Sequence, residues 1–359
     1  MRRREFLSGS AAVLAASASL AQSHAETPLP AAISPTESAS AAAAARIPRV
    51  KSPGVRRGEM LYRQLGSTGV EVSLVGLGGS KIGRSNISDA EAIRLTQQAI
   101  DRGINFLDNG WDYNDGQSEQ RTGAALAQAG YRQKAFLMTK IDGRTKTEAA
   151  RQLEMSLRRL QTDHIDLLQF HEVIRFDDAD RIFHSGGAME AVLDAQKAGK
   201  VRFIGFTGHK DPRIHLYMLE VADRHSFHFD ALQMPINVMD AHFRSFAQLV
   251  VPQALQRGIG VLGMKCFAAG HILRSGVIEP MDCLKFCLNV PVSVQITDIN
   301  SQMLLDQAFA AVKQFVPMKK HEVASLISKT EQAAISGEFE PFKTTATFDA
   351  TARRTDWLG

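Results

Sequence analysis

The feature that most constrains the fold of this chain is a regular alternation of two kinds of segment between residues 72 and 315. Short, mainly apolar runs typical of buried strands are each followed by a longer segment whose apolar residues recur with the period of a helix. The strands are expected at 72–77, 104–107, 135–139, 165–169, 201–206, 231–233, 258–264 and 292–296. The helices are expected at 89–101, 120–128, 146–160, 188–198, 214–223, 243–256, 281–288 and 302–315. Eight such units in about 250 residues favour an α/β fold of the (β/α)8 TIM barrel type over a doubly wound sheet, which seldom needs so many strands.

Both ends of this alternation carry additions. Residues 61–65 and 70–74 flank the turn Gly66-Ser67-Thr68-Gly69, a pattern that predicts an N-terminal β-hairpin. Beyond residue 317 one more helix is expected at 322–334, followed by a loop-rich end. The sequence therefore predicts a single barrel domain at 60–359, with a C-terminal helical extension from about residue 317.

The first 25 residues are typical of an export signal. Arg3-Arg4 precedes an uncharged run at 6–23 and the small-residue cleavage candidate Ser23-His24-Ala25, which together indicate a twin-arginine signal peptide at 1–25. The alternative is a basic start ahead of a membrane anchor, but the run is weakly apolar compared with the roughly 20 apolar residues of a spanning helix. We therefore expect export by the twin-arginine machinery to the periplasm, without stable membrane insertion of the mature chain.

Residues 26–59 are rich in proline and alanine and poor in large apolar side chains. Such a composition favours an extended or mobile chain over a packed one. We therefore predict a disordered linker at 26–59, with order beginning near Met60.

Charge and cysteine content exclude several classes of function. The formal net charge is +4, and removing the three positive charges and one negative charge of residues 2–5 leaves +2. With no basic stripe that carries interleaved aromatic residues, nucleic acid is not an expected partner. The three cysteines and the histidines at 225, 228 and 242 lack metal-ligand spacing, so no metal site is expected.

Four ionisable residues stand at or just beyond the predicted ends of consecutive strands. Asp108 and Tyr113 follow the second strand, Lys140 the third and His171 the fourth. In a parallel barrel the carboxyl ends of the strands meet at one mouth, so these side chains should share a pocket. A neighbouring ammonium favours an ionised phenol, and we expect Lys140 to lower the pKa of Tyr113 from its usual value of about 10, as suits a general acid.

Four stretches closely resemble the aldo/keto reductase family. They are Tyr62-Arg63-Gln64-Leu65-Gly66-Ser67-Thr68-Gly69, residues 105–119 (NFLDNGWDYNDGQSE), Met138-Thr139-Lys140, and residues 157–171 (LRRLQTDHIDLLQFH). The resemblance covers about residues 61–312. It implies Tyr113 as proton donor to a substrate carbonyl, Lys140 and Asp108 as its tuning pair, and His171 as a polar partner for the carbonyl oxygen. It also implies hydride transfer from a nicotinamide cofactor, NADP or NAD, and a small carbonyl or alcohol substrate.

The same resemblance assigns residues to the cofactor. Thr207, His209 and Gln233 stand where relatives hold the nicotinamide carboxamide, and Met264 stands where many relatives stack a tyrosine on the nicotinamide ring. A thioether can still pack against a ring. Lys265, in the loop after the seventh strand, either contacts a cofactor phosphate or is simply exposed.

The loop after the eighth strand departs from the family pattern. Relatives usually place basic residues there to bind the adenosine 2′-phosphate, whereas this chain has Thr297-Asp298-Ile299-Asn300-Ser301 and no Lys or Arg before Lys313. Asp298 would repel a phosphate and is better suited to a ribose hydroxyl. Asp298 and Ser301 are therefore candidate cofactor residues, and NADP and NAD both remain open because a Lys or Arg from another loop could serve.

Two hypotheses of function follow. The first is an exported NAD(P)-dependent oxidoreductase that reduces an aldehyde or ketone or runs in the alcohol direction, with Trp111 and Phe176 either lining its substrate pocket or simply packing. The alternative is a catalytically weak barrel that serves as a nicotinamide-nucleotide-sensing or partner-binding module, which the altered eighth loop and an exported location would suit. The first hypothesis is favoured by the retained Asp108, Tyr113, Lys140 and His171.

Overall fold

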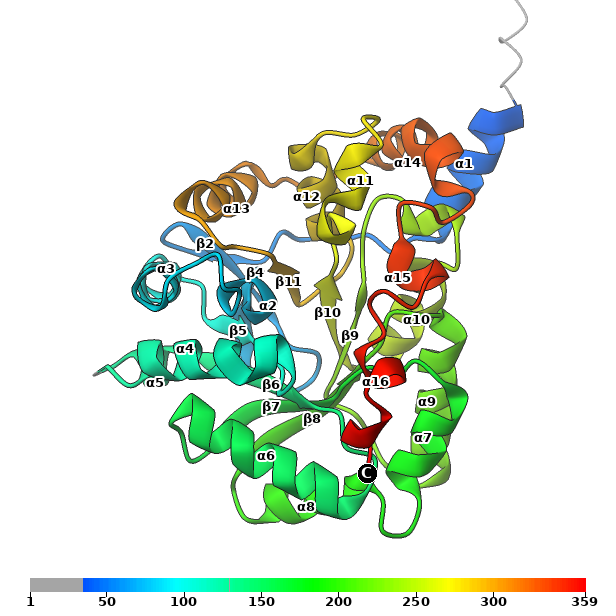
Figure 1. Ribbon diagram of the computed structural model, residues 1–359. Helices are drawn as coiled ribbons and strands as arrows, with labels where there is room; N and C mark the ends of the chain where they lie inside the picture. Colours follow the sequence, from blue (N-terminus) through cyan, green and yellow to red (C-terminus); the bar gives the residue numbers. More distant parts are fainter. Residues whose placement is uncertain (1–34, 129) are drawn as a thin grey trace, which may run out of the picture. The chain divides into compact units, whose positions relative to one another are not determined.

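A closed barrel of eight parallel strands forms the centre of the protein (Figure 1). The computed structural model describes residues 35–128 and 130–359. Around the barrel the strand order is β10-β11-β4-β5-β6-β7-β8-β9, so each strand pairs with its neighbours in the sequence. The strands are β4 (Val75–Gly78), β5 (Phe106–Asp108), β6 (Phe136–Ile141), β7 (Ile165–Phe170), β8 (Val201–Thr207), β9 (Ala231–Pro235), β10 (Gly260–Met264) and β11 (Val294–Thr297). The predicted (β/α)8 barrel is confirmed.

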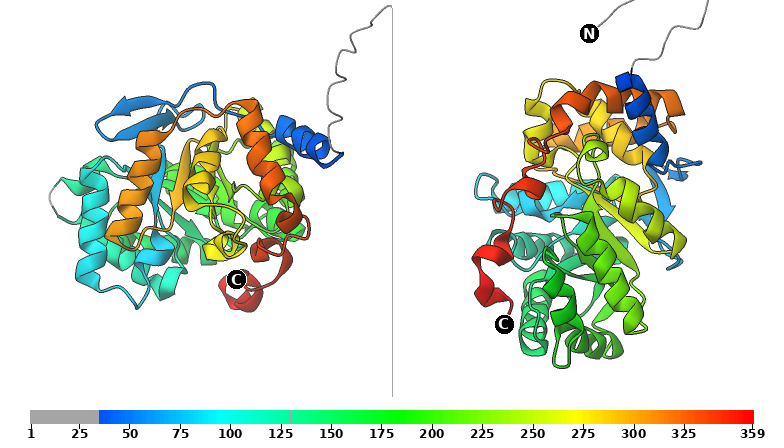
Figure 2. Two further views of the ribbon diagram at one scale, coloured as in Figure 1. Left: turned by 90° about the horizontal axis from the view of Figure 1, so that it is seen from above. Right: turned by 90° about the vertical axis from the view of Figure 1, so that its right-hand side faces the viewer.

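The helices surround the barrel on its outside (Figure 2). Those that connect its strands are α3 (Asp89–Asp101), α4 (Gln117–Leu126), α6 (Lys146–Leu160), α8 (Ala188–Lys197), α9 (Pro212–Arg224), α10 (Phe246–Gln256), α12 (Pro280–Asn289) and α13 (Gln302–Gln314). Several begin at a side-chain cap that satisfies a free backbone N–H: Ser88 accepts a hydrogen bond from the Glu91 N–H, and Thr145 accepts one from the Glu148 N–H. Shorter elements lie in the loops: α2 (Gly79–Ile82), η1 (Tyr113–Gly116), α5 (Tyr131–Lys134), α7 (Phe176–Phe183), η2 (Asp240–His242), η3 (Ala268–Gly270) and α11 (His271–Arg274).

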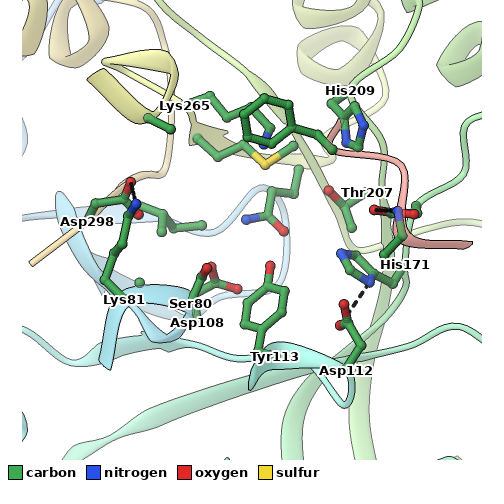
Figure 3. A pocket seen from close by; sticks show the side chains of 18 of the residues that line it. Ser80, Lys81, Asp108, Asp112, Tyr113, His171, Thr207, His209, Lys265 and Asp298 are labelled. Atoms are coloured by element: carbon green, nitrogen blue, oxygen red, sulfur yellow. Dashed lines mark hydrogen bonds and ion pairs between the residues drawn. The ribbon is translucent and has the colours of Figure 1, made fainter. Parts of the chain in front are cut away.

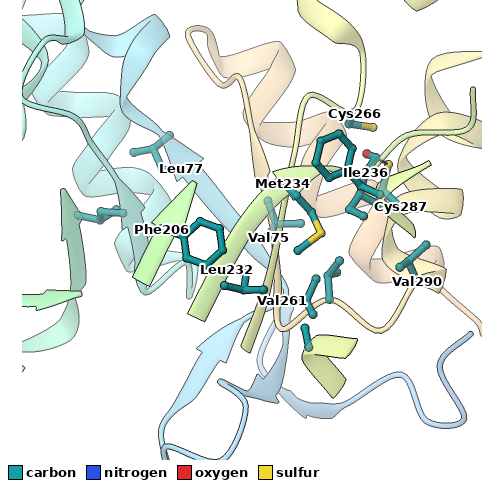
Figure 4. Packing of buried hydrophobic residues seen from close by; sticks show 14 of the residues in the cluster. Val75, Leu77, Phe206, Leu232, Met234, Ile236, Val261, Cys266, Cys287 and Val290 are labelled. Carbon is teal, nitrogen blue, oxygen red and sulfur yellow. Dashed lines mark hydrogen bonds between the residues drawn. The ribbon is translucent and has the colours of Figure 1, made fainter. Parts of the chain in front are cut away.

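Apolar side chains pack on both sides of the strands. Outside the barrel they form a continuous layer between strands and helices, in which Val75, Leu232 and Met234 are fully buried (Figure 4). A second cluster fills the barrel itself and includes Phe106 and Leu167. Because these buried apolar residues fill the interior below the mouth, the barrel is a packed core and its chemistry is confined to the mouth.

The predicted N-terminal hairpin is confirmed and closes the amino end of the barrel. It consists of β2 (Met60–Gln64) paired antiparallel with β3 (Glu71–Ser73), and Leu65 beside it joins the cluster inside the barrel. Gly66 in its turn has a φ of 53°, and a Cβ there would lie 2.4 Å from the Gly258 carbonyl oxygen. Only glycine therefore allows this close approach of the two backbones.

The predicted linker at 26–59 is wrong where the structure describes it. Helix α1 (Pro35–Arg46) packs along α14 (Lys320–Ala334), and β1 (Val55–Arg57) adds a third strand to the hairpin. An alanine run propagates a helix at little entropic cost, and burial of Ala44 and Ile47 fixes this one against the barrel domain. The predicted signal at 1–25 and the first part of the linker lie outside the described residues.

After α14, which confirms the helix expected at 322–334, the chain runs along the barrel mouth (Figures 1 and 2). This C-terminal tail, residues 337–359, contains α15 (Pro341–Thr344), α16 (Ala350–Arg353) and η4 (Thr355–Trp357). It ends against the loop that precedes α6, where the Arg144 N–H donates to the Leu358 carbonyl at 2.8 Å. Among the helices in the described part of the chain, none is both long enough and apolar enough to cross a membrane.

Candidate active site

Most of the predicted site residues meet in one cavity at the carboxyl ends of the strands (Figure 3). Its volume is about 350 Å³, within the ordinary range for ligand sites. Of the eleven residues assigned from the sequence, nine line it: Asp108, Tyr113, His171, Thr207, His209, Gln233, Met264, Lys265 and Asp298. Lys140 lies just beneath the lining, and Ser301 lies outside it.

Lys140 connects the acid and the phenol. It projects from β6 and is only 1% exposed. Its ammonium donates to the Asp108 carboxylate, to the Asn109 carbonyl at 2.5 Å and to the Tyr113 hydroxyl at 3.1 Å. The Asp108 carboxylate compensates the buried ammonium and, with Asn109, holds it against the phenol oxygen. Asp108, Lys140 and Tyr113, which the sequence placed at one mouth, therefore form one hydrogen-bonded chain.

The expected lowering of the Tyr113 pKa is wrong for the protein as described. Burial raises the pKa of Tyr113 well above its usual value of 10, and the carboxylates of Asp108 and Asp112 raise it further. One ammonium does not offset this combined penalty on a phenolate. Tyr113 therefore holds its proton at neutral pH, which is the state that a proton donor requires.

His171 lies edge-on to Tyr113, with ring centroids 5.6 Å apart, and its Nδ1 faces two carboxylates, of which that of Asp142 is buried and that of Asp112 is partly buried. The Oδ1 of Asp142 is 3.0 Å from this nitrogen and the Oδ1 of Asp112 is 3.3 Å from it. Burial alone would lower the pKa of His171, but Asp112 and Asp142 outweigh burial and raise the pKa to about 10. The ligand atoms of the three residues lie within 4.8 Å of one another, an arrangement that could also suit a metal ion.

The loops that carry these groups are held together by a buried guanidinium. Arg144 is 1% exposed and donates to the Asp142 carbonyl at 2.7 Å and to the His171 carbonyl at 2.8 Å. Its charge is balanced by Asp178, at 3.0 Å. Since five donors in a fixed plane bind several acceptors at once, Arg144 fixes the loop after β6 relative to the loop after β7.

The residues expected to bind nicotinamide differ in whether their polar atoms are already bonded within the protein. The Oε1 of Gln233 is buried, lines the cavity and has no hydrogen-bond partner among the described residues. His209, by contrast, is bound by Asp349 of the C-terminal tail at 3.0 Å, and the Lys265 ammonium lies 4.7 Å from the ring centroid of Phe348 in the same tail. The tail therefore contacts two of the predicted cofactor residues.

Basic residues near Asp298 come from a different loop. The Lys81 ammonium, in α2, is 3.8 Å from the Asp298 carboxylate, and Arg84 lines the same cavity. This is the situation left open from the sequence, in which another loop supplies the positive charge. Ser301 does not reach the cavity: its hydroxyl accepts a hydrogen bond from the Leu304 N–H at 3.4 Å and caps α13.

Several site residues were not anticipated. Asp112, Asp142 and Glu172 could have been found, because each directly follows or closely follows a predicted strand at the barrel mouth. No sequence signal placed the C-terminal tail at the cavity, to which it brings the lining residues Thr347, Phe348, Ala350 and Arg353. Glu172 holds it there by accepting hydrogen bonds from the Ala350 and Thr351 N–H groups at 3.0 and 2.8 Å.

The two aromatic candidates for an apolar substrate pocket pack instead. The Trp111 ring meets Trp357 edge-on at 5.4 Å, and Phe176 is 50% exposed beside Tyr217. Neither residue lines the cavity.

Comparison with known sequences identifies one family. Residues 74–282 match the pattern of the aldo/keto reductase family. Among similar proteins is the uncharacterised oxidoreductase YrpG of Bacillus subtilis, 31% identical over 230 residues, which are 59% of this chain and 68% of that protein. Another is the L-galactose dehydrogenase of Arabidopsis thaliana, 27% identical over 226 residues, which are 60% of this chain and 68% of that protein.

A solved structure agrees with the fold. The holo form of the aldo-keto reductase AKR11C1 from Bacillus halodurans superimposes with a TM-score of 0.62 at 24% sequence identity. The match covers 74% of this chain and 96% of that one. At this identity the likeness establishes the barrel architecture.

Proposed function

The chain belongs to the aldo/keto reductase family and is an oxidoreductase of that type, and from this premise we propose that it reduces an aldehyde or ketone to an alcohol, or catalyses the reverse, with Tyr113 as proton donor. The observation that supports this most strongly is the chain from Asp108 through Lys140 to the Tyr113 hydroxyl, buried at the barrel mouth opposite His171.

Members of this family generally use NAD(P)H, which supplies a hydride to the carbonyl carbon when it is bound. The residues of this cavity fit the nicotinamide end of such a cofactor. The unpartnered Oε1 of Gln233 can accept a hydrogen bond from a carboxamide, Thr207 lies beside it in the lining, and Met264 offers a thioether to an aromatic ring.

The protein's own groups supply the proton and the electrostatic setting. Tyr113, protonated at neutral pH, donates its hydroxyl proton to the carbonyl oxygen as negative charge develops there. Lys140 directs the phenol oxygen and stabilises the phenolate that remains, while Asp108 keeps Lys140 in place. His171 is the second polar group available to the carbonyl oxygen.

The choice between NADP and NAD depends on charge at the far side of the cavity. Asp298 disfavours a 2′-phosphate, but Lys81 partly offsets it, and Arg84 has no ion-pair partner among the described residues. We propose that NADP remains the better candidate because these two cations are available. Titrating the protein with NADPH and NADH separately, followed by intrinsic fluorescence, measures the preference directly.

We further propose that the protein is exported to the periplasm by the twin-arginine machinery, as the residues Arg3-Arg4 and the uncharged run after them suggest. Replacing both arginines with lysine should leave the protein in the cytoplasmic fraction. Unchanged export of the double variant would contradict this route.

Kinetics on a panel of aldehydes and ketones test the proton donor. Tyr113→Phe keeps the ring but removes the hydroxyl, so we expect kcat to fall by about a hundredfold or more, the usual contribution of a general acid, with cofactor binding preserved. Tyr131→Phe is the matched control, because the Tyr131 hydroxyl bonds to Asp101 on the exposed surface. Equal turnover by wild type and Tyr113→Phe would refute the role, and failure to bind either cofactor would refute the oxidoreductase hypothesis and leave only a partner-binding module.

A further inference from the structure

His171 has an environment that its proposed role does not require. A polar partner for a carbonyl oxygen needs one ring N–H, and a backbone carbonyl would suffice to orient the ring. Here Nδ1 instead faces two carboxylates, from Asp142 at 3.0 Å and Asp112 at 3.3 Å. Both acids come from loops at the barrel mouth, after β6 and β5, and the side chain of Asp142 is fully buried.

Each of the two carboxylates has an oxygen that lacks a hydrogen-bond donor. The Oδ2 of Asp142 and the Oδ1 of Asp112 accept no hydrogen bond from any described group, apart from the ion-pair contact of Asp112 with His171. The guanidinium of Arg144, which contacts the same loop, is occupied by Asp178 and by backbone carbonyls, including that of Asp142. Around a neutral imidazole, the fully buried carboxylate of Asp142 and the 10% exposed one of Asp112 would be left without a compensating positive charge, which is costly for a buried ion.

We propose that Asp112 and Asp142 are positioning residues that hold His171 as an imidazolium, so that the substrate oxygen meets a full positive charge beside the Tyr113 hydroxyl. The catalytic effect of this charge depends on the proposed carbonyl chemistry, whereas the measurement that tests the charge does not. In this arrangement Nδ1–H donates to the carboxylates, which leaves Nε2–H for the cavity (Figure 3). The imidazolium stabilises the developing oxyanion without giving up its proton, while Tyr113 transfers its own.

The other charged groups around the ring support the same state. Glu172 follows His171 in the chain and lines the cavity, and Asp108 lies across the cavity from it. The Lys140 ammonium opposes a second positive charge but is already paired with Asp108. Among these groups, the carboxylates therefore outnumber the unpaired positive charges. The raised pKa of His171, about 10, agrees with this count.

The direct test is the protonation state of His171 in the purified protein, followed by ¹⁵N NMR of the imidazole nitrogens between pH 6 and 10. We expect both nitrogens of His171 to carry protons at pH 8, with His171→Gln identifying the signal. His215 is an internal reference, because it is equally buried but faces no carboxylate and burial lowers its pKa to about 4. A neutral His171 at pH 8 in the wild type would overturn the proposal.

Asp142→Asn and Asp112→Asn remove one charge each while keeping the shape of the side chain. In either variant His171 should lose its proton at a lower pH than in the wild type. As a separate control, Zn²⁺ added to the wild type should leave the His171 signals unchanged. An unaltered titration in both variants would overturn the proposal, and so would displacement of the His171 proton by Zn²⁺, since the carboxylates would then form a cation site. The NMR measurement needs no substrate, so it decides the proposal even if the proposed activity fails.

The pH dependence of kcat/KM distinguishes a role of the charge on His171 from a merely structural role of Asp142. At pH 8 the reduction kcat/KM of Asp142→Asn should fall about tenfold, because a charged hydrogen bond is worth more than a neutral one, and the deficit should shrink as the pH is lowered toward 6 and His171 recovers its proton. Asp163→Asn, which removes the carboxylate of the exposed pair with His164, is the matched control and should behave as wild type. A deficit that is independent of pH would contradict the charge role.

Discussion

Two histidines in this protein are buried to a similar degree and yet are expected to differ in charge. His171 lies between two carboxylates, whereas His215 is completely buried with the rings of Phe206 and Phe246 about 5 Å away. The Nε2 of His215 lies 3.2 Å from the Gln233 carbonyl, so this ring helps to position the strand that carries Gln233. Burial without a negative neighbour lowers the pKa of His215 to about 4.

Acid should therefore destabilise the protein through His215. The unfolded chain binds a proton at this residue near pH 6.5 and the folded protein only near pH 4, so the stabilisation is complete above pH 6.5 and is lost as the pH falls toward 4. The loss should amount to about 3 kcal/mol. Urea unfolding at several pH values should show a shallower acid dependence for His215→Gln than for the wild type, and parallel curves would contradict the assignment.

For individual residues, the sequence predicted which side chains meet at the barrel mouth but not which of them carry a proton. Asp108, Tyr113, Lys140 and His171 could be grouped because each stands at or just beyond the end of a strand, and strand ends in a barrel converge. The pKa of Tyr113 could not be predicted, since it depends on burial and on carboxylates from its own loop and from two other loops, which only the folded chain brings together.

At the scale of helices and strands, prediction was most accurate where local signals agree. The bounds of α3 and α6 follow the expected ranges, because each begins at a side-chain cap and has one regular apolar face. The prediction failed at α1, where the alanine run was taken for a linker. An Ala-rich segment becomes an ordered helix only when a partner covers it, and the partner, α14, lies almost 300 residues further along the chain.

The end of α6 offers a stabilising substitution. Gln161, the residue that caps its C-terminus after Leu160, is exposed and has the left-handed φ of 54°, which costs a non-glycine residue about 1 kcal/mol or more. Gln161→Gly should therefore raise the free energy of unfolding, by about 0.5 kcal/mol after the entropy cost of glycine. Arg158→Gly, within the same helix and also exposed, should lower it by about 1 kcal/mol. A loss of stability in both variants, measured by urea unfolding, would contradict this account of the cap.

At the scale of the whole molecule, the C-terminal tail completes the barrel mouth. Lys343 anchors it: its side chain is fully buried and its ammonium binds Asp240 at 2.8 Å, Glu340 at 2.9 Å and the Phe243 carbonyl at 2.7 Å. Further along, Glu172 and His209 bind the tail over the cavity. The sequence predicted an extension here but not its path, because the contacts that fix it are made between residues more than 90 positions apart.

Removing the anchor charge should be costly. Lys343→Met would leave two carboxylates buried without a counter-ion, so we expect a loss of about 3 to 5 kcal/mol in the free energy of unfolding. Lys320→Met, at an exposed position of α14, is the matched control and should change stability by less than about 0.5 kcal/mol. Urea unfolding followed by circular dichroism measures both, and similar values for the two variants would show that the tail is not held by this charge.

The central claim, that this barrel transfers a hydride between a nicotinamide cofactor and a carbonyl compound, is tested most directly by isotope transfer. The purified protein is incubated with NADPH or NADH that carries deuterium at both C4 positions of the nicotinamide and with a panel of aldehydes and ketones, and the products are analysed by mass spectrometry. We expect the wild type to form an alcohol with one deuterium on the former carbonyl carbon, and Tyr113→Phe to form much less of it. Absence of deuterated alcohol with either cofactor across the panel, from a protein shown to be folded, would contradict the claim.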